Sequence, residues 1–181
     1  MTELYAKRVE LLRELLPRAS RISALFNMSN PSLPPAWKEI ETAARSLGMQ
    51  PQLLDVRKPE DLGPAFDGAV RRRTDALVVG LDTLTLASQR LIVDLAAKHR
   101  LPAVYASMEF AGGLVVYGVN YPDHYRRAAT FADRIFKGTQ PGDLPVERPT
   151  KFELIINVKT AKALGLTIPP SLLQRADQVI E

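Results

Sequence analysis

The sequence contains no cysteine among its 181 residues. Disulfide bonds, cysteine-ligated zinc and thiol catalysis are therefore excluded. A protein without cysteine can function on either side of a bacterial inner membrane. No window approaches the roughly 18 consecutive apolar residues that a membrane span requires. The first residues form a charged amphipathic segment and not a signal peptide, so the chain as written carries no export signal and is expected in the cytoplasm if expressed in this form.

Phosphate-binding and nucleophile motifs are also missing. The chain has no Gly-x-x-x-x-Gly-Lys-[Ser/Thr] loop, no Gly-x-Gly-x-x-Gly after the first predicted strand and no Gly-x-Ser-x-Gly elbow. Its two histidines, His99 and His124, lack metal-ligand spacing and are interpreted as surface or capping residues. We therefore expect no cofactor, no metal and no enzymatic activity.

Positive charge is in modest excess, with a formal net charge of +4 and a pI near 9.5. The one dense basic run is Arg71-Arg72-Arg73, which lies beside Asp67 and Asp75 at the end of a predicted helix. Cations are favourable at helix C-termini, and no aromatic residues are interleaved with these arginines. The run indicates a solvated helix end rather than a phosphate-binding patch, and no nucleic-acid partner is expected.

What the sequence does contain is a regular alternation of apolar runs and amphipathic stretches. Strands are predicted at 21–27, 52–56, 75–81, 102–105 and 114–117, and helices at 7–16, 34–47, 59–73 and 83–99. Beyond these, the pattern predicts a helix at 125–136, a proline-spaced extended segment at 141–149, a strand at 152–157 and helices at 158–164 and 171–180. The fold class is α/β, a doubly wound, mostly parallel sheet flanked by helices.

The stretch from Gly112 to Asn120 marks the carboxyl end of the last strand in this alternation. Gly112-Gly113 predicts a turn with positive φ, and Gly118 is expected to end the strand. Open α/β sheets bind ligands at the carboxyl ends of their strands. The candidate ligand-binding residues at these ends are Asn27, Ser29, Asn30, Asp82, Thr83, Tyr105, Ser107, Tyr117 and Asn120.

These side chains are better suited to ligand binding than to catalysis. Neutral amides, hydroxyls, one carboxylate and two aromatic rings can hold a small polar or amphipathic molecule. Structural roles remain open for many of them. The alternatives are turn formation for Asn27 and Asn30, a helix N-cap for Asp82 or Thr83, and core packing for Tyr105 and Tyr117.

Several motifs together resemble one protein family. They are Lys7-Arg8-Val9-Glu10-Leu11-Leu12, the Asn-x-x-Asn-Pro loop from Asn27, Gly112-Gly113-Leu114-x-x-Tyr117-Gly118, Lys137-Gly138-x-x-Pro141-x-Asp143-Leu144-Pro145-Val146-Glu147 and the run from Pro149 to Pro169. On these residues the chain resembles the solute-binding proteins of ABC transporters, in the branch that includes tryptophan- and other amino-acid-binding members. The likeness extends through nearly the whole chain and is most specific over 137–169.

The resemblance implies a periplasmic or lipoprotein receptor in which two α/β lobes of the type I periplasmic-binding-protein fold close on a small-molecule solute and deliver it to an ABC permease and ATPase. Only the C-terminal lobe is expected here. Residues 1–120 would form the ligand-binding lobe, 121–149 a hinge-crossing helix and extended segment, and 150–181 a returning strand and terminal helices. The hinge-crossing helix would expose Phe131, Ile135 and Phe136, so homo-oligomerisation through this hinge-side surface is expected.

Two other functions are compatible with the same fold. One is the ligand-sensing domain of a transcriptional regulator, which would need a DNA-binding helix-turn-helix before Lys7. The other is a flavodoxin-like or Rossmann-like enzyme, which would need a cofactor loop after the first strand. The sequence leaves the identity of the ligand open, because aromatic side chains such as Tyr105 and Tyr117 can stack on an aromatic amino acid or on a sugar.

Overall fold

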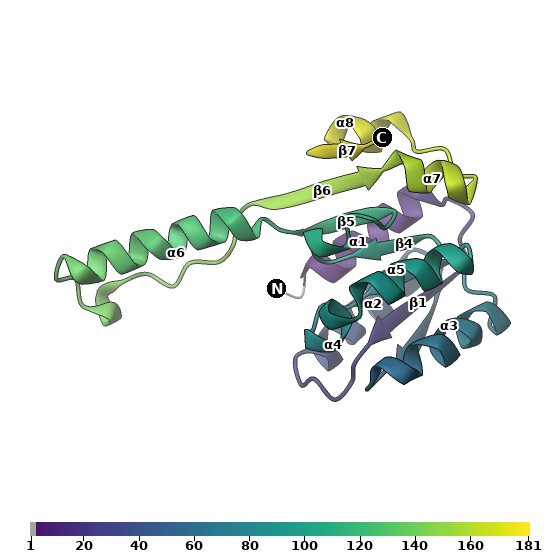
Figure 1. Cartoon of the computed structure of the whole chain (residues 1–181), viewed down its shortest axis with the longest axis horizontal. Helices are drawn as coiled ribbons and strands as arrows, with labels where there is room; N and C mark the ends of the chain where they lie inside the picture. Colours follow the sequence, from purple (N-terminus) through teal and green to yellow (C-terminus); the bar gives the residue numbers. More distant parts are fainter. Residues whose placement is uncertain (1–2) are drawn as a thin grey trace.

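The computed structural model describes residues 3–181, which are built around a seven-stranded sheet of order β2-β1-β3-β4-β5-β6-β7 (Figure 1). The first five strands are parallel, β6 runs antiparallel to β5, and β7 is parallel to β6. The bounds are β1 Arg21–Phe26, β2 Gln50–Asp55, β3 Ala76–Val79, β4 Ala103–Tyr105, β5 Val115–Val119, β6 Phe152–Asn157 and β7 Gln178–Ile180. The predicted mostly parallel α/β sheet is confirmed.

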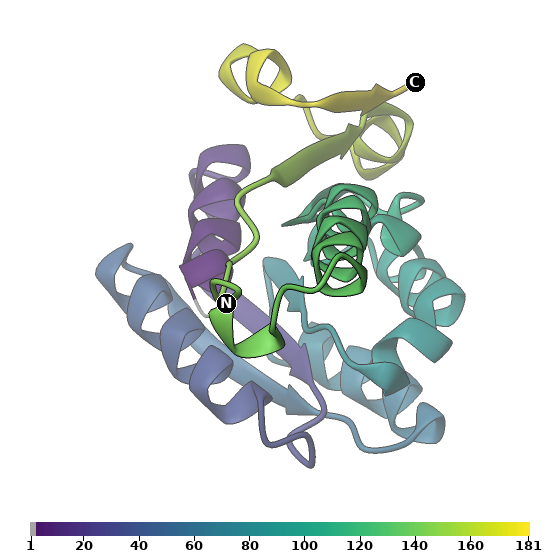
Figure 2. The same cartoon turned by 90° about the vertical axis from the view of Figure 1, so that its left-hand side faces the viewer.

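Helices cover both faces of this sheet (Figure 2). On one face lie α1 (Glu3–Leu15), α2 (Leu33–Ser46) and the short α8 (Pro170–Arg175). On the other lie α3 (Leu62–Arg71) and α5 (Gln89–Lys98). The remaining helices are α4 (Thr83–Ala87), α6 (Tyr121–Phe136) and α7 (Val158–Leu164), with single 3₁₀ turns at Pro59–Asp61, Met108–Phe110 and Pro141–Asp143. Within residues 3–181, no helix has the length and apolarity needed to cross a membrane.

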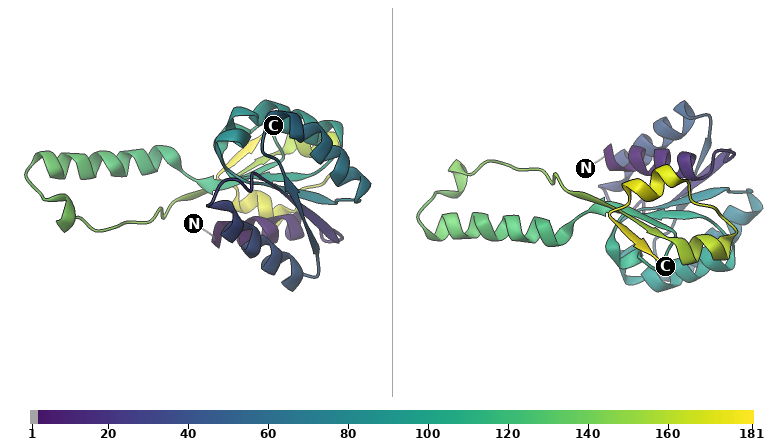
Figure 3. Two further views of the ribbon diagram at one scale, coloured as in Figure 1. Left: turned by 90° about the horizontal axis from the view of Figure 1, so that it is seen from below. Right: turned by 90° about the horizontal axis from the view of Figure 1, so that it is seen from above.

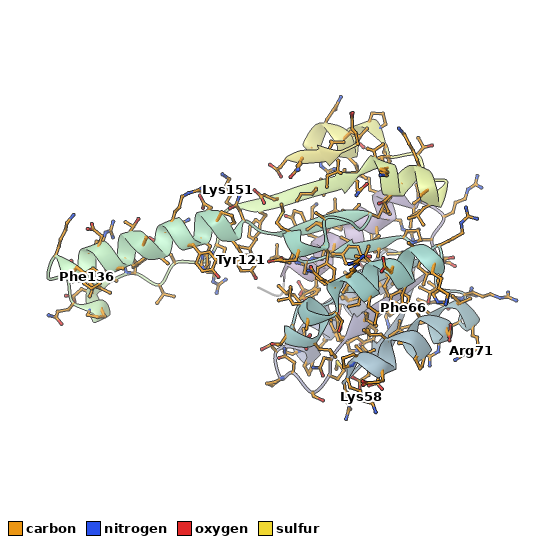
Figure 4. All side chains as sticks on the ribbon, in the orientation of Figure 1. Lys58, Phe66, Arg71, Tyr121, Phe136 and Lys151 are labelled. Carbon is orange, nitrogen blue, oxygen red and sulfur yellow. The ribbon has the colours of Figure 1, made fainter. Side chains whose placement is uncertain are left out.

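Helical periodicity accounts for the packing of α3 against α5. Phe66 is fully buried and points inward, whereas Arg71, at the end of α3, points to solvent (Figure 4). Lys58, which precedes the 3₁₀ turn before α3, also points to solvent. The ring of His99 stacks on Phe66 at a centroid distance of 6.0 Å. His99 therefore serves as a packing residue at the end of α5.

An arm formed by α6 and the chain that returns from it extends away from the sheet (Figures 1 and 3). Every residue of α6 is at least partly exposed, and Phe136, near the tip, is 88% exposed (Figure 4). Arg127 holds the two sides of the arm together, since its guanidinium pairs with Glu147 and donates to the hydroxyl of Thr150 at 2.8 Å. The arm thus has local cross-links but little core of its own.

The prediction of a terminal helix at 171–180 is wrong for the second half of that range. Helix α8 ends at Arg175, and Gln178–Ile180 forms β7 on the open edge of β6. The Leu154 amide donates to the Asp177 carboxylate at 2.8 Å, and the Asp177 amide donates to the Leu154 carbonyl at 2.9 Å. The free backbone groups of an edge strand therefore override a side-chain spacing that also suits a helix.

Other helix boundaries differ from those predicted because of local capping. The helix predicted at 83–99 is divided at Ser88, whose ψ of 14° interrupts the α-helical backbone. Helix α6 begins at Tyr121 rather than at Tyr125. There, the side-chain oxygen of Asn120 accepts the amide of Asp123 at 2.7 Å, which adds a first turn.

Two glycines have a different role from the one predicted. Gly113 does not adopt positive φ; a Cβ there would lie 2.1 Å from the ring of Tyr105. Gly118 does not end β5, which continues to Val119, and a Cβ on Gly118 would lie 2.1 Å from the carbonyl oxygen of Ala106. Close approach of a neighbour, rather than turn geometry, explains both positions.

The carboxylate of Asp75 ties the start of β1 to the start of β3. It accepts the amides of Ser20 at 2.7 Å and Arg21 at 2.8 Å. Partial burial acts to raise the pKa of Asp75, but these donors outweigh it and hold that pKa below its usual range. The carboxylate therefore stabilises the fold when ionised.

Asp75→Asn is expected to lower the free energy of unfolding by about 1–2 kcal/mol at neutral pH, since charge-assisted hydrogen bonds become neutral ones. A group with a depressed pKa contributes its stability above its unfolded pKa of about 4 and loses it as the pH falls through its folded pKa. The difference between variant and parent should therefore shrink in acid, as measured by urea unfolding at pH 7 and pH 3. Asp94→Asn, at an exposed position of α5, is the control. An equal difference in the free energy of unfolding at both pH values would contradict a stabilising role for the ionised Asp75 carboxylate.

Candidate ligand-binding site

A pocket of about 300 Å³ lies at the carboxyl ends of the parallel strands. Its walls come from α1, the start of α2, the segments that follow β3 and β4, the end of β5 and the first residue of α6. The lining residues are Leu4, Tyr5, Arg8, Ser32, Leu33, Ala36, Leu81, Ala106, Val119 and Tyr121. This is the edge at which open α/β sheets bind ligands.

Arg8 supplies a buried cation to the pocket. The residue is only 3% exposed, its Nε donates to the carbonyl of Tyr117 at 2.8 Å, and its guanidinium carbon lies 4.5 Å from the centroid of the Tyr5 ring. Burial lowers the pKa of Arg8, while Tyr5 and the charge of Glu39 oppose this effect. Because arginine titrates far above neutral pH, the guanidinium stays charged. The pocket therefore presents a positioned cation.

Two tyrosines add aromatic surface around this cation. Tyr5 packs edge to face on Phe26 at 5.4 Å, and its hydroxyl accepts the amide of Leu81 at 3.4 Å. Tyr121 lies at the base of α6 (Figure 4), where burial and then the charge of Glu109 raise the pKa of its phenol. The other walls are mostly aliphatic. Such a surface can hold an apolar body with a negative group at Arg8.

The candidate residues after β1 form a local turn. The Asn27 side-chain oxygen accepts the amide of Ser29 at 3.1 Å, and that of Asn30 accepts the amide of Ser32 at 3.0 Å. Ser29 itself is exposed. These short polar side chains satisfy backbone donors at the entry to α2.

Capping occupies two of the candidates that follow later strands. Asp82 caps α4 by accepting the amide of Thr85 at 2.9 Å, and Thr83 is the exposed first residue of that helix. Asn120 caps α6 and also donates to the Glu153 carboxylate. The side-chain oxygens of Asp82 and Asn120 are thus already engaged in the protein.

The remaining candidates are divided between the two faces of the sheet. Tyr105 is 1% exposed and stacks on Phe110 at 5.0 Å beneath α5, and the buried Ser107 donates to Glu109. The ring of Tyr117 lies 6.3 Å from that of Phe152, and its carbonyl accepts from Arg8. Among residues 3–181, the pocket lining includes none of the candidates, although Leu81, Ala106 and Val119 are direct sequence neighbours of some.

Comparison with known families identifies the chain. The sequence profile described as ABC transporter substrate binding protein matches residues 2–180. The chain belongs to this family. Members are solute-binding proteins, in agreement with the resemblance carried by the motifs above.

Individual relatives of this substrate-binding protein are distant in sequence. A tyrosine-binding protein from Clostridioides difficile is 26% identical over 163 residues, which are 88% of this chain and 47% of the relative. The structure of the ABC domain in complex with L-Trp from Streptococcus pneumonia superposes with a TM-score of 0.86 at 24% identity, covering 98% of this chain and 62% of the other.

A conserved domain protein from Vibrio cholerae gives a TM-score of 0.87 at 22% identity, covering 97% of this chain and 60% of the other. The chain therefore spans about half to three fifths of the length of the relatives it matches. Its fold is that of the corresponding part of a periplasmic-binding-protein-like α/β protein.

Sequence reasoning missed Tyr5, Arg8 and Tyr121 as pocket residues of this substrate-binding protein. Arg8 carried a usable signal, because it lies on the apolar stripe of α1, three residues after Tyr5 and four before Leu12. A cation on the buried stripe of a helix needs a buried partner or a ligand. Among residues 3–181, no group of three or more histidine, aspartate or glutamate side chains is placed to hold a metal ion.

Proposed function

We propose that this chain is the C-terminal ligand-binding lobe of an ABC import receptor that binds an aromatic amino acid and passes it to a permease outside the cytoplasm. The observation that carries the proposal is the buried Arg8 guanidinium set between aromatic and aliphatic walls at the carboxyl edge of the sheet. Arg8 would hold the ligand carboxylate, and the rings of Tyr5 and Tyr121 would contact the ligand side chain.

The ligand class also draws support from relatives. One is called a tyrosine-binding protein, and the structure from Streptococcus pneumonia contains L-Trp. A pocket of about 300 Å³ lies at the small end of ligand sites, and it suits one side of such a molecule. In the proposed receptor, a second lobe would close over the other side.

The direct test is a titration of the ¹⁵N-labelled chain with L-tryptophan, L-tyrosine and tryptamine, which has the indole ring but no carboxylate. Both amino acids should give saturable, weak binding with shifts concentrated at the pocket residues, because one wall alone buries little of the ligand. Tryptamine should bind more weakly still, since it brings a second cation to Arg8. Submicromolar affinity of the isolated chain for either amino acid would contradict a site with only one wall. Chemical-shift changes confined to another surface would contradict the assignment of the site to this pocket.

The arm is proposed to mediate self-association of the isolated chain. Phe136 is 88% exposed and Ile135 is 39% exposed on α6, close to Phe131 on the same helix. The double substitution Ile135→Ser/Phe136→Ser should shift the chain toward monomer in light scattering over a concentration series, because it removes apolar surface that a second copy would bury. Leu91→Ser, at a residue 45% exposed on α5, should have no such effect. A parent chain that stays monomeric at every concentration would refute self-association.

A further inference from the structure

A second cavity, of about 540 Å³, lies between α5 and α7. It is bordered by Leu101 and Ala103 at the start of β4, whereas the first pocket is bordered by Ala106 beyond the end of that strand. Figure 1 shows α7 next to the end of α5 that is farthest from the arm. The two sites are therefore at opposite ends of the sheet, and the second cavity is independent of the proposed amino-acid site.

The inner wall of this cavity includes a tyrosine hydroxyl that has no hydrogen-bond partner in the protein. Tyr105 lines the cavity and is 1% exposed, and among residues 3–181 its hydroxyl makes no hydrogen bond. Burial raises the pKa of Tyr105, so the phenol is neutral and can both donate and accept. In contrast, the hydroxyl of the other buried tyrosine, Tyr5, accepts an amide. The hydroxyl oxygen is not fully enclosed by protein, so a ligand or water in the cavity can pair with it.

The ring that carries this hydroxyl is fixed in place. It stacks on Phe110 with an interplanar angle of 13°, and it lies where a Cβ on Gly113 would be. The opposite wall is fixed as well, because Asn157 donates to the Ala111 carbonyl and Thr160 to the Gly112 carbonyl, each at 3.1 Å. The cavity is thus bounded by rigid elements, as preformed ligand sites usually are.

The rim of the cavity is cationic and its interior is apolar. Arg100 and Lys159 are exposed rim residues, and within residues 3–181 neither forms an ion pair. Glu181 adds negative charge to the lining, so a monoanion at Arg100 and Lys159 is favoured over a dianion. The interior is aliphatic, with Val93 on one side and Leu164 on the other.

We propose that this cavity binds a small amphipathic carboxylate with a hydrogen-bonding group at its apolar end. The carboxylate contacts Arg100 and Lys159 at the rim, the apolar body lies between α5 and α7, and the inner polar group pairs with the hydroxyl of Tyr105. An aromatic hydroxy acid has this arrangement of groups. The site is distinct in position and chemistry from the pocket that contains Arg8.

The probes for the test are 4-hydroxyphenylacetate and phenylacetate, titrated into the ¹⁵N-labelled 181-residue chain. The hydroxylated acid should bind saturably, with shifts at α5, α7 and 111–114. Tyr105→Phe should weaken its binding roughly tenfold and leave phenylacetate binding unchanged, since only the hydroxyl pair is lost. The same substitution should leave the melting temperature of the free protein nearly unchanged, because the hydroxyl makes no hydrogen bond within the protein. This combination separates a ligand-binding hydroxyl from a structural one.

Rim variants provide the second measurement. Arg100→Gln and Lys159→Gln should each weaken both acids several-fold, whereas Lys162→Gln, an exposed position on α7 outside the cavity lining, should not. Absence of saturable binding by either acid overturns the proposal. It is also overturned by shifts confined to the Arg8 pocket, or by a Tyr105→Phe variant that binds 4-hydroxyphenylacetate as the parent does.

Discussion

Replacing Gly118 with alanine is expected to lower the free energy of unfolding by about 3 kcal/mol, at the upper end of the range for overpacked positions. The added Cβ would lie 2.1 Å from the carbonyl oxygen and 2.9 Å from the carbonyl carbon of Ala106. Both atoms belong to backbone, so β5 and the end of β4 would have to move apart. Urea denaturation followed by circular dichroism measures the change.

Gly63 is the matched control for this substitution. It lies in α3, and a Cβ there would meet nothing within 4 Å. Gly63→Ala should therefore raise the free energy of unfolding by about 0.4–1 kcal/mol through the reduced entropy of the unfolded chain. A Gly118→Ala variant as stable as the parent would mean that the strands separate easily. Ala106 forms one side of this contact, Val119 follows Gly118 in the chain, and both line the pocket. The close approach of β5 to the end of β4 therefore helps to set the shape of the pocket.

Local sequence patterns were sufficient to predict the parallel part of the sheet. Each of β1 and β3 is a short apolar run that is buried on both faces, and the intervening helices show a single apolar stripe. The pattern failed at β7, where the same residues suit a helical stripe or a strand. Only the open edge of β6 decides between them, and that edge is set by chain far from Gln178–Ile180 in the sequence.

The sequence predicted the edge of the sheet at which the pocket lies, but not its lining. Short polar side chains at strand ends, such as Asn30 and Asp82, are also the residues best suited to turns and caps, and the structure uses them in that way. The pocket instead depends on α1 crossing to β5, where Arg8 contacts a residue 109 positions away. A local pattern carries no information on such a contact, although an arginine on a buried stripe indicates that one exists.

Arg8→Met is expected to weaken binding of L-tryptophan by about 10- to 100-fold, since a charge-assisted hydrogen bond is worth roughly 1.5–3 kcal/mol. Methionine has a similar length and removes a buried charge, so the fold should tolerate it better than a truncation. Tryptamine, which is itself a cation, should bind the variant as well as or better than the parent. Opposite changes for the two ligands, measured by NMR titration, identify Arg8 as the carboxylate-binding residue.

Arg13→Met provides the matched control for this prediction. Arg13 lies on the same helix and donates to the carbonyls of Pro17 at 2.9 Å and Ala19 at 3.0 Å, outside the pocket lining. Its loss should reduce stability by a small amount and leave both ligand affinities unchanged. If Arg8→Met weakened tryptophan and tryptamine equally, the effect would be a distortion of the pocket. In that case the role of the Arg8 guanidinium would be to bind the Tyr117 carbonyl and not a ligand.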